Sequence, residues 1–195
     1  MKKHNSVITI TLAGLLCAIG IIIPMFAPKV VIEPASFTLA SHVPVFIAMF
    51  ISPTISIAVA LLTSLGFLIS GTPIIIVLRA LTHLIFASLG AFILKKNNNV
   101  LLSTKSATAY SFLISLVHAV AEVIVVTLFY WGGSIAAYEE KGYFFTVIIL
   151  VGIGTLIHSM IDFSIAVFVW KPLHQIISIP FNAKVRSRTT KAKIQ

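Results

Sequence analysis

Arg79 and His83 lie four residues apart inside an apolar stretch that runs from Gly71 to Lys96. At this spacing both side chains project from one face of a helix. Arg79 is the one lysine or arginine that we place well inside an apolar segment, where a charge normally faces a polar cavity or a partner. Because an arginine fork binds a carboxylate through two parallel hydrogen bonds, this pair predicts an anion site. The structural alternative is an ion pair between Arg79 and Glu122.

The ionisable side chains in apolar segments fall into two groups by depth, at a rise of about 1.5 Å per helical residue. The upper group, near one end of the helices, is His42, Arg79, His83 and Glu122. The lower group, at or below the middle, is His118, His158 and Asp162. We expect the upper group to line a substrate pocket and the lower group to form a network between helices.

His118 precedes Glu122 by four residues, and His158 precedes Asp162 by the same interval, so each pair shares a helix face. These ligand types on two helices are also compatible with a divalent metal, which makes an intramembrane metal-dependent hydrolase the alternative class of function. Against this alternative, the sequence has no Glu-Glu pair for general-base chemistry, and Arg79 would repel a cation. We therefore expect no metal, no cofactor and no catalytic residue.

Composition identifies the environment of these residues. The chain has 195 residues, of which 58% are hydrophobic and 10% charged, and its mean hydropathy is +1.08. These values indicate a multi-pass protein of the cell membrane. The net charge of +9 does not indicate nucleic-acid binding, because nearly all lysines and arginines flank apolar segments. Cys17 is the single cysteine, which excludes an internal disulfide and a cysteine-based metal cluster.

The apolar segments predict an all-α fold, with one domain of six transmembrane helices over residues 1–195. The expected helices cover residues 6–25, 37–51, 53–70, 73–94, 107–130 and 143–170. A proline-rich connection follows the first helix, and residues 171–195 form a basic, partly disordered cytoplasmic tail.

The positive charges predict the orientation, because lysine and arginine mark the cytoplasmic side of a multi-pass protein. One side carries Lys2, Lys3, Lys95, Lys96, Lys105, Lys171, Lys184, Arg186, Arg188, Lys191 and Lys193. The other carries Lys29 and Lys141 together with Glu33, Glu139 and Glu140. Both termini are therefore expected in the cytoplasm, and the connections at 27–36, 70–73 and 131–141 outside.

Small residues recur at a spacing of four in the first helix, at Ala13, Gly14, Cys17 and Ala18. A smooth flank of this kind lets a second helix approach closely. It indicates either packing inside the bundle or a docking surface for another membrane subunit.

Taken together, these features resemble the substrate-binding S component of an energy-coupling factor (ECF) transporter over essentially the whole chain. Residues 41–53 (SHVPVFIAMFISP) and 79–83 (RALTH) are similar to S components for pantothenate or niacin. The resemblance implies capture of a vitamin from outside, a membrane T subunit and two cytoplasmic ATPase subunits. The chain lacks a Gly-x-x-x-x-Gly-Lys-Ser/Thr loop and so is not itself the ATPase.

Both vitamins are carboxylates, so Arg79 is expected to bind either of them, with His42 and His83 as further donors. Tyr130 and Trp131 are expected to cover the ligand. Pantothenate, the preferred substrate, would use Glu122 as an acceptor for its hydroxyl groups. Niacin, the alternative, would need an aromatic stacking surface.

Overall fold

The computed structural model describes residues 2–32, 35–133, 141–176 and 180–185, with no side-chain description for residues 2–6. The predicted charges at Glu33, Glu139, Glu140, Arg186, Arg188, Lys191 and Lys193 lie outside the described residues.

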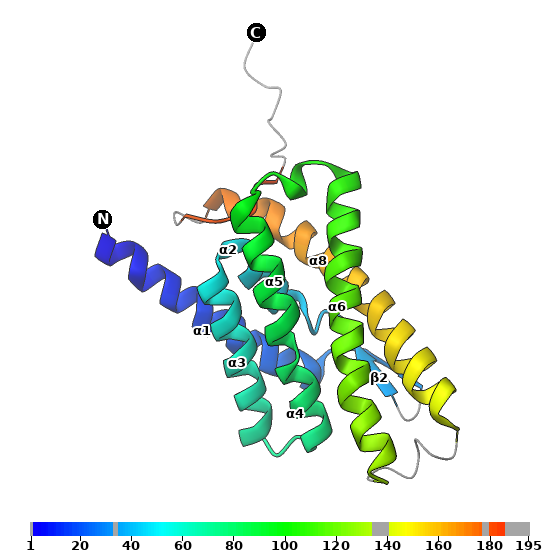
Figure 1. The fold of residues 1–195 in the computed structure, drawn as a ribbon. Coiled ribbons are helices and arrows are strands. Elements are labelled where there is room, and N and C mark those ends of the chain that lie inside the picture. Colours follow the sequence, from blue (N-terminus) through cyan, green and yellow to red (C-terminus); the bar gives the residue numbers. More distant parts are fainter. Residues whose placement is uncertain (1, 33–34, 134–140, 177–179, 186–195) are drawn as a thin grey trace.

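The described chain is a helical bundle with one short β-hairpin (Figure 1). Its elements are α1 (Lys2–Phe26), β1 (Lys29–Ile32), β2 (Ala35–Thr38), α2 (Val43–Ile51), α3 (Pro53–Ile69), α4 (Ile74–Leu81), α5 (His83–Lys96), the 3-10 helix η1 (Val100–Leu102), α6 (Thr104–Trp131), the π-helix η2 (Phe144–Ile153) and α8 (Gly154–Ile176). In Figure 1, α1 crosses the bundle obliquely.

Four segments among the described residues are long and apolar enough to cross a membrane. They are Val7–Phe26, Ile74–Lys96, Thr104–Trp131 and Phe144–Ile176, and Pro53–Ile69 is a shorter apolar helix. The chain is thus a multi-pass helical membrane protein. The predicted count of six spanning helices is not confirmed.

The second predicted helix is shorter than expected and lies in the centre of the bundle. α2 begins at Val43 rather than Phe37, and all nine of its residues are buried. Nine residues extend only about 14 Å, less than half of a hydrocarbon core of about 30 Å. Helix α2 packs against α1, α3, α5 and α8, which explains why it is apolar on every side.

The residues before α2 form a hairpin where the sequence predicted an irregular connection and the start of a helix. β1 and β2 pair antiparallel, with Lys29 opposite Thr38 and Ile32 opposite Ala35. Val30, Val31 and Ile32 favour extended backbone because their branched side chains are crowded in a helix. The hairpin ends before Ala40, whose φ of +66° places it in the left-handed region. This turn separates the hairpin from α2 and makes the helix start later than predicted.

The fourth predicted helix is divided at Thr82, between α4 and α5. The Thr82 hydroxyl donates a hydrogen bond of 2.6 Å to the carbonyl oxygen of Arg79. Side-chain bonds of this kind compete with the regular helical pattern. Arg79 therefore belongs to the last turn of α4, and His83 begins α5.

The chain after α8 returns to the bundle. α8 continues to Ile176, beyond the predicted end at Trp170. The backbone N–H groups of Asn182 and Ala183 donate to the carbonyl oxygen of Phe50 at 2.9 and 3.0 Å. Trp170, which is fully buried, donates its indole N–H to the carbonyl of Ala183 at 3.1 Å. Residues 180–185 thus satisfy the last carbonyls of α2, which have no partner within that helix.

Candidate functional site

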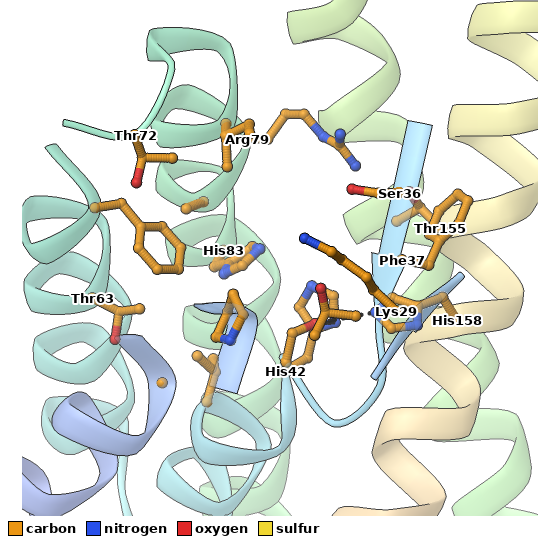
Figure 2. A pocket seen from close by; sticks show the side chains of 18 of the residues that line it. Lys29, Ser36, Phe37, His42, Thr63, Thr72, Arg79, His83, Thr155 and His158 are labelled. Atoms are coloured by element: carbon orange, nitrogen blue, oxygen red, sulfur yellow. Dashed lines mark hydrogen bonds between the residues drawn. The ribbon is translucent and has the colours of Figure 1, made fainter. Parts of the chain in front are cut away.

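A cavity of about 250 Å³ lies between α1, the hairpin, α3, α4, α5, α6 and α8. Its ionisable lining residues are Lys29, His42, Arg79, His83, Glu122 and His158. Its uncharged polar lining includes Ser36, Ser41, Thr63, Thr72 and Thr155. Figure 2 shows the labelled side chains surrounding a central space, with Arg79 on one side and His42 and His158 on another. All four residues of the predicted upper group contribute to this lining.

Arg79 and Glu122 form an ion pair at one side of the cavity. Arg79 Nη2 donates to Glu122 Oε2 at 2.9 Å, and the hydroxyl of Thr155 donates to the same oxygen at 2.6 Å. The Glu122 side chain is only 4% exposed, whereas that of Arg79 is 17% exposed. A buried carboxylate needs such partners because desolvation of an unpaired charge is costly. The pairing of Arg79 with Glu122, stated above as a structural alternative, is therefore present beside the cavity.

Asp162 connects α8 to the start of α2. One of its oxygens accepts from the backbone N–H of Ala40 at 2.8 Å, and the other accepts from the backbone N–H of His42 at 2.9 Å. His42 Nδ1 lies 3.0 Å from the second oxygen. The His42 side chain makes no capping bond of its own. A carboxylate from another helix therefore supplies the negative charge that a helix N-terminus favours.

The four histidines His42, His83, His118 and His158 meet beside this contact. The ring centroid of His42 lies 4.9 Å from that of His83, 4.7 Å from that of His118 and 4.9 Å from that of His158. His83 and His118 are also 4.9 Å apart. Bonds between helices are present, as expected for the lower group. However, the predicted separation by depth is wrong, because His158 lines the cavity and Asp162 bonds directly to His42.

Tyr130 and Trp131 lie outside the lining of this cavity. Trp131 stacks on Tyr143 with ring centroids 5.4 Å apart, and Tyr130 meets the edge of the same ring at 5.2 Å. These rings join the end of α6 to the start of η2. Their contact with a ligand stays a prediction, and their position outside the lining of this cavity does not favour it.

Lys29 and Phe37 line the cavity from the hairpin, and neither was predicted from the sequence to do so. Figure 2 shows the Lys29 side chain directed into the central space. The signal for Lys29 was present, since it is one of two lysines on the side of the membrane opposite the basic cluster. Phe37 was not recognised because the sequence predicted a helix from this residue onward.

The small residues of α1 point in two directions. Ala13 packs against the main hydrophobic core, and the hydroxyl of Thr63 contacts Cys17 Sγ at 3.9 Å. Gly14 and Ala18 are exposed, and a Cβ atom added at Gly14 would meet no atom within 4 Å. The two predicted uses of this helix, packing and docking, thus fall on different residues.

The fold and the cavity define a class: a multi-pass helical membrane protein that encloses a polar site for a small ligand. Across 194 residues, the chain is 40% identical to the niacin transporter NiaX of Lactococcus lactis subsp. cremoris (strain MG1363), an alignment covering 99% of this chain and 86% of that protein. No family model and no solved structure matches the chain at a significant level. The chain belongs to the S components of ECF vitamin transporters.

Membership in this family excludes the hydrolase alternative, because an S component is a non-catalytic transport subunit. The geometry agrees, since Glu122, one of the four ligands predicted for the hydrolase, is bonded to Arg79 and Thr155. The family implies a vitamin substrate and ECF partner subunits in general.

Proposed function

We propose that this chain binds niacin at the cavity beside Arg79 and delivers it to an ECF transporter. The observation that carries the proposal is the relative, a niacin transporter that aligns over nearly the whole chain. The preference for pantothenate has no such support. Its predicted hydroxyl acceptor, Glu122, already accepts hydrogen bonds from Arg79 and Thr155.

The lining of the cavity suits a flat aromatic acid. A guanidinium has five N–H donors, so Arg79 can hold Glu122 with one arm and bind the niacin carboxylate with another. Lys29 adds a second positive charge and makes no ion pair among the described residues. Phe37 and Phe67 offer aromatic surface to the pyridine ring. His42 and His83 supply nitrogen atoms that can donate to or accept from the ligand.

The distribution of charge supports access to the cavity from outside the cell. Lys95, Lys96, Lys105 and Lys171 flank the ends of helices α5, α6 and α8 that lie away from the hairpin. By the positive-inside rule this end faces the cytoplasm, together with both termini. The hairpin with Lys29 then lies at the outer side, where it can cover a bound vitamin.

We assign the exposed residues Gly14 and Ala18 of α1 to docking of a membrane T subunit, which would couple the chain to two cytoplasmic ATPases. Exposed small residues allow the backbones of two membrane helices to approach closely. Ala13 and Cys17, which face the bundle, are assigned to internal packing.

Equilibrium binding to the purified chain tests the proposed substrate. Niacin, nicotinamide and pantothenate are titrated separately, and nicotinamide serves as the matched control because it keeps the ring but lacks the carboxylate. Niacin is expected to bind at least tenfold more tightly than the other two. Equal affinity for niacin and nicotinamide would remove the carboxylate from recognition, and tighter binding of pantothenate would overturn the substrate.

A further inference from the structure

The histidine cluster beside the cavity has the composition of a transition-metal site. His42, His83 and His118 each offer one ring nitrogen, and these three atoms lie within 4.8 Å of one another. His83 and His118 come from different helices, α5 and α6, and His42 directly precedes α2. Neutral imidazole is a good ligand for zinc, copper and nickel.

The surroundings of His42 and His118 resemble the outer shell of a metal site. A histidine that binds a metal usually donates its other ring N–H to a carboxylate, a carbonyl or water. His42 Nδ1 is 3.0 Å from the fully buried carboxylate of Asp162, and His118 Nδ1 is 3.4 Å from the hydroxyl of Ser159. These contacts hold Nδ1 of each ring, so a metal would bind through Nε2, which in His118 lies 3.5 Å from Glu122 Oε1.

His118 Nε2 is a second, independent indication. Its residue is fully buried, and this atom makes no hydrogen bond among the described residues, although Glu122 Oε1 lies 3.5 Å away. The contact with Glu122 is longer than an ordinary hydrogen bond, and a buried polar atom that is poorly satisfied costs free energy because it has lost its bond to water. A bound cation would satisfy this nitrogen.

The local charges also permit a cation. The objection that Arg79 would repel a metal is weakened by its ion pair with Glu122, which leaves these two groups without net charge. Asp162 makes its ion pairs, among the described residues, with His42 and His158. If both histidines are neutral, the carboxylate of Asp162 leaves one negative charge beside the cluster.

We propose that His42, His83 and His118 bind a divalent transition-metal ion such as zinc, and that Asp162 orients His42. A second group, His42 with His158 and Asp162, shares one residue with the first. It is less suitable because both oxygens of Asp162 already accept backbone hydrogen bonds. Zinc–nitrogen bonds of about 2.0–2.1 Å require the three rings to turn inward, and three protein ligands leave a fourth position for water or a carboxylate.

The test uses the full chain, purified without a polyhistidine tag and treated with a chelator. Co²⁺ is the probe, because its visible absorption reports tetrahedral nitrogen coordination, and Zn²⁺ is the competitor. One Co²⁺ per chain is expected, with absorption that Zn²⁺ abolishes. His83→Gln and His42→Gln are expected to weaken Co²⁺ binding at least tenfold. His174→Gln is the control, since His174 bonds to the carbonyl of Trp170 away from the cluster.

Several outcomes would overturn the proposal. In the first, the folded chain binds no Co²⁺. In the second, both cluster variants bind Co²⁺ with wild-type affinity. In the third, the His174 control loses as much Co²⁺ affinity as the cluster variants do. If the cluster variants fail to fold, X-ray absorption of the zinc-loaded wild-type chain decides. Three nitrogen ligands at about 2.0–2.1 Å support the site, and a shell of oxygen ligands alone overturns it.

Niacin binding is measured in parallel on the chelated chain and on the zinc-loaded chain, which keeps the two proposals separate. Loss of Co²⁺ binding with niacin binding intact removes the metal site alone. Co²⁺ binding with no niacin binding to either preparation removes the proposed substrate and leaves the metal site.

Discussion

Replacing Arg79 with alanine is expected to weaken both niacin binding and folding, for separate reasons. The affinity falls because the vitamin carboxylate loses the guanidinium. The fold is weakened because Glu122, whose side chain is 4% exposed, loses its cation. If Arg79 only contacted the ligand, as the sequence predicted, its replacement would leave the stability of the fold unchanged.

The two losses have different expected sizes. Removing one partner of a buried ion pair costs about 3 to 5 kcal/mol, and the lower value applies here because Arg79 is partly exposed and Thr155 still bonds to Glu122. About 3 kcal/mol corresponds to a fall in thermal midpoint of roughly 6 to 12 °C for a chain of this size. Loss of the charge contact to the carboxylate is expected to cost about 2 to 5 kcal/mol, which weakens Kd by about 30-fold to 4,000-fold.

A double variant separates the two effects. In Arg79→Ala with Glu122→Gln, the buried negative charge is removed together with its partner. The thermal midpoint is therefore expected to recover most of its loss, while the affinity for niacin stays low. Arg79→Lys is expected to restore the affinity only partly, because an ammonium group does not have the planar fork of arginine.

Calorimetric titration with niacin and thermal unfolding of the same preparations, in one detergent, measure both quantities. Two results would refute the reasoning. Wild-type affinity in the double variant would show that Arg79 does not bind the carboxylate. An unchanged thermal midpoint in the single variant would show that the ion pair with Glu122 does not stabilise the fold.

Three further predictions follow from the hairpin and from α1. Lys29→Ala is expected to weaken niacin binding about threefold, because Lys29 is solvent-exposed and its charge is partly screened; unchanged affinity in a titration at low salt contradicts this role. Gly14→Leu is expected to abolish niacin uptake and co-purification of the T subunit while niacin binding to the isolated chain persists, and loss of all three would indicate internal packing. Gly154→Ala would place a Cβ atom 2.5 Å from Phe37 Cζ, so the Phe37 ring, which lines the cavity, must shift and niacin is expected to dissociate several-fold faster in stopped-flow measurements. Gly152→Ala is its control, with the nearest atom 3.3 Å away, and equal rates in the two variants would remove the Phe37 ring from ligand retention.

The sequence by itself determined the class of this protein and its unusual residues. A segment that crosses lipid must have apolar side chains, and its backbone must satisfy its own hydrogen bonds, as a helix does. Hydropathy alone therefore predicted a multi-pass helical protein. Ionisable residues are costly in such segments, so Arg79 and Glu122 were candidate site residues before any contact was known. Their ion pair, at 2.9 Å, joins α4 to α6 as the structural alternative required.

Only the tertiary structure decided which residues meet. Val30 to Ile32 is a short apolar run that is compatible with strand or helix, and its pairing with residues 35–38 made it a strand. Asp162 contacts the start of α2, 120 residues earlier in the chain, and no spacing rule along one helix predicts a contact of that kind. The rotation of α1 likewise exposed Gly14 and turned Cys17 toward Thr63. Depth along a helix follows from sequence, whereas rotation and neighbours depend on how side chains of several helices interlock.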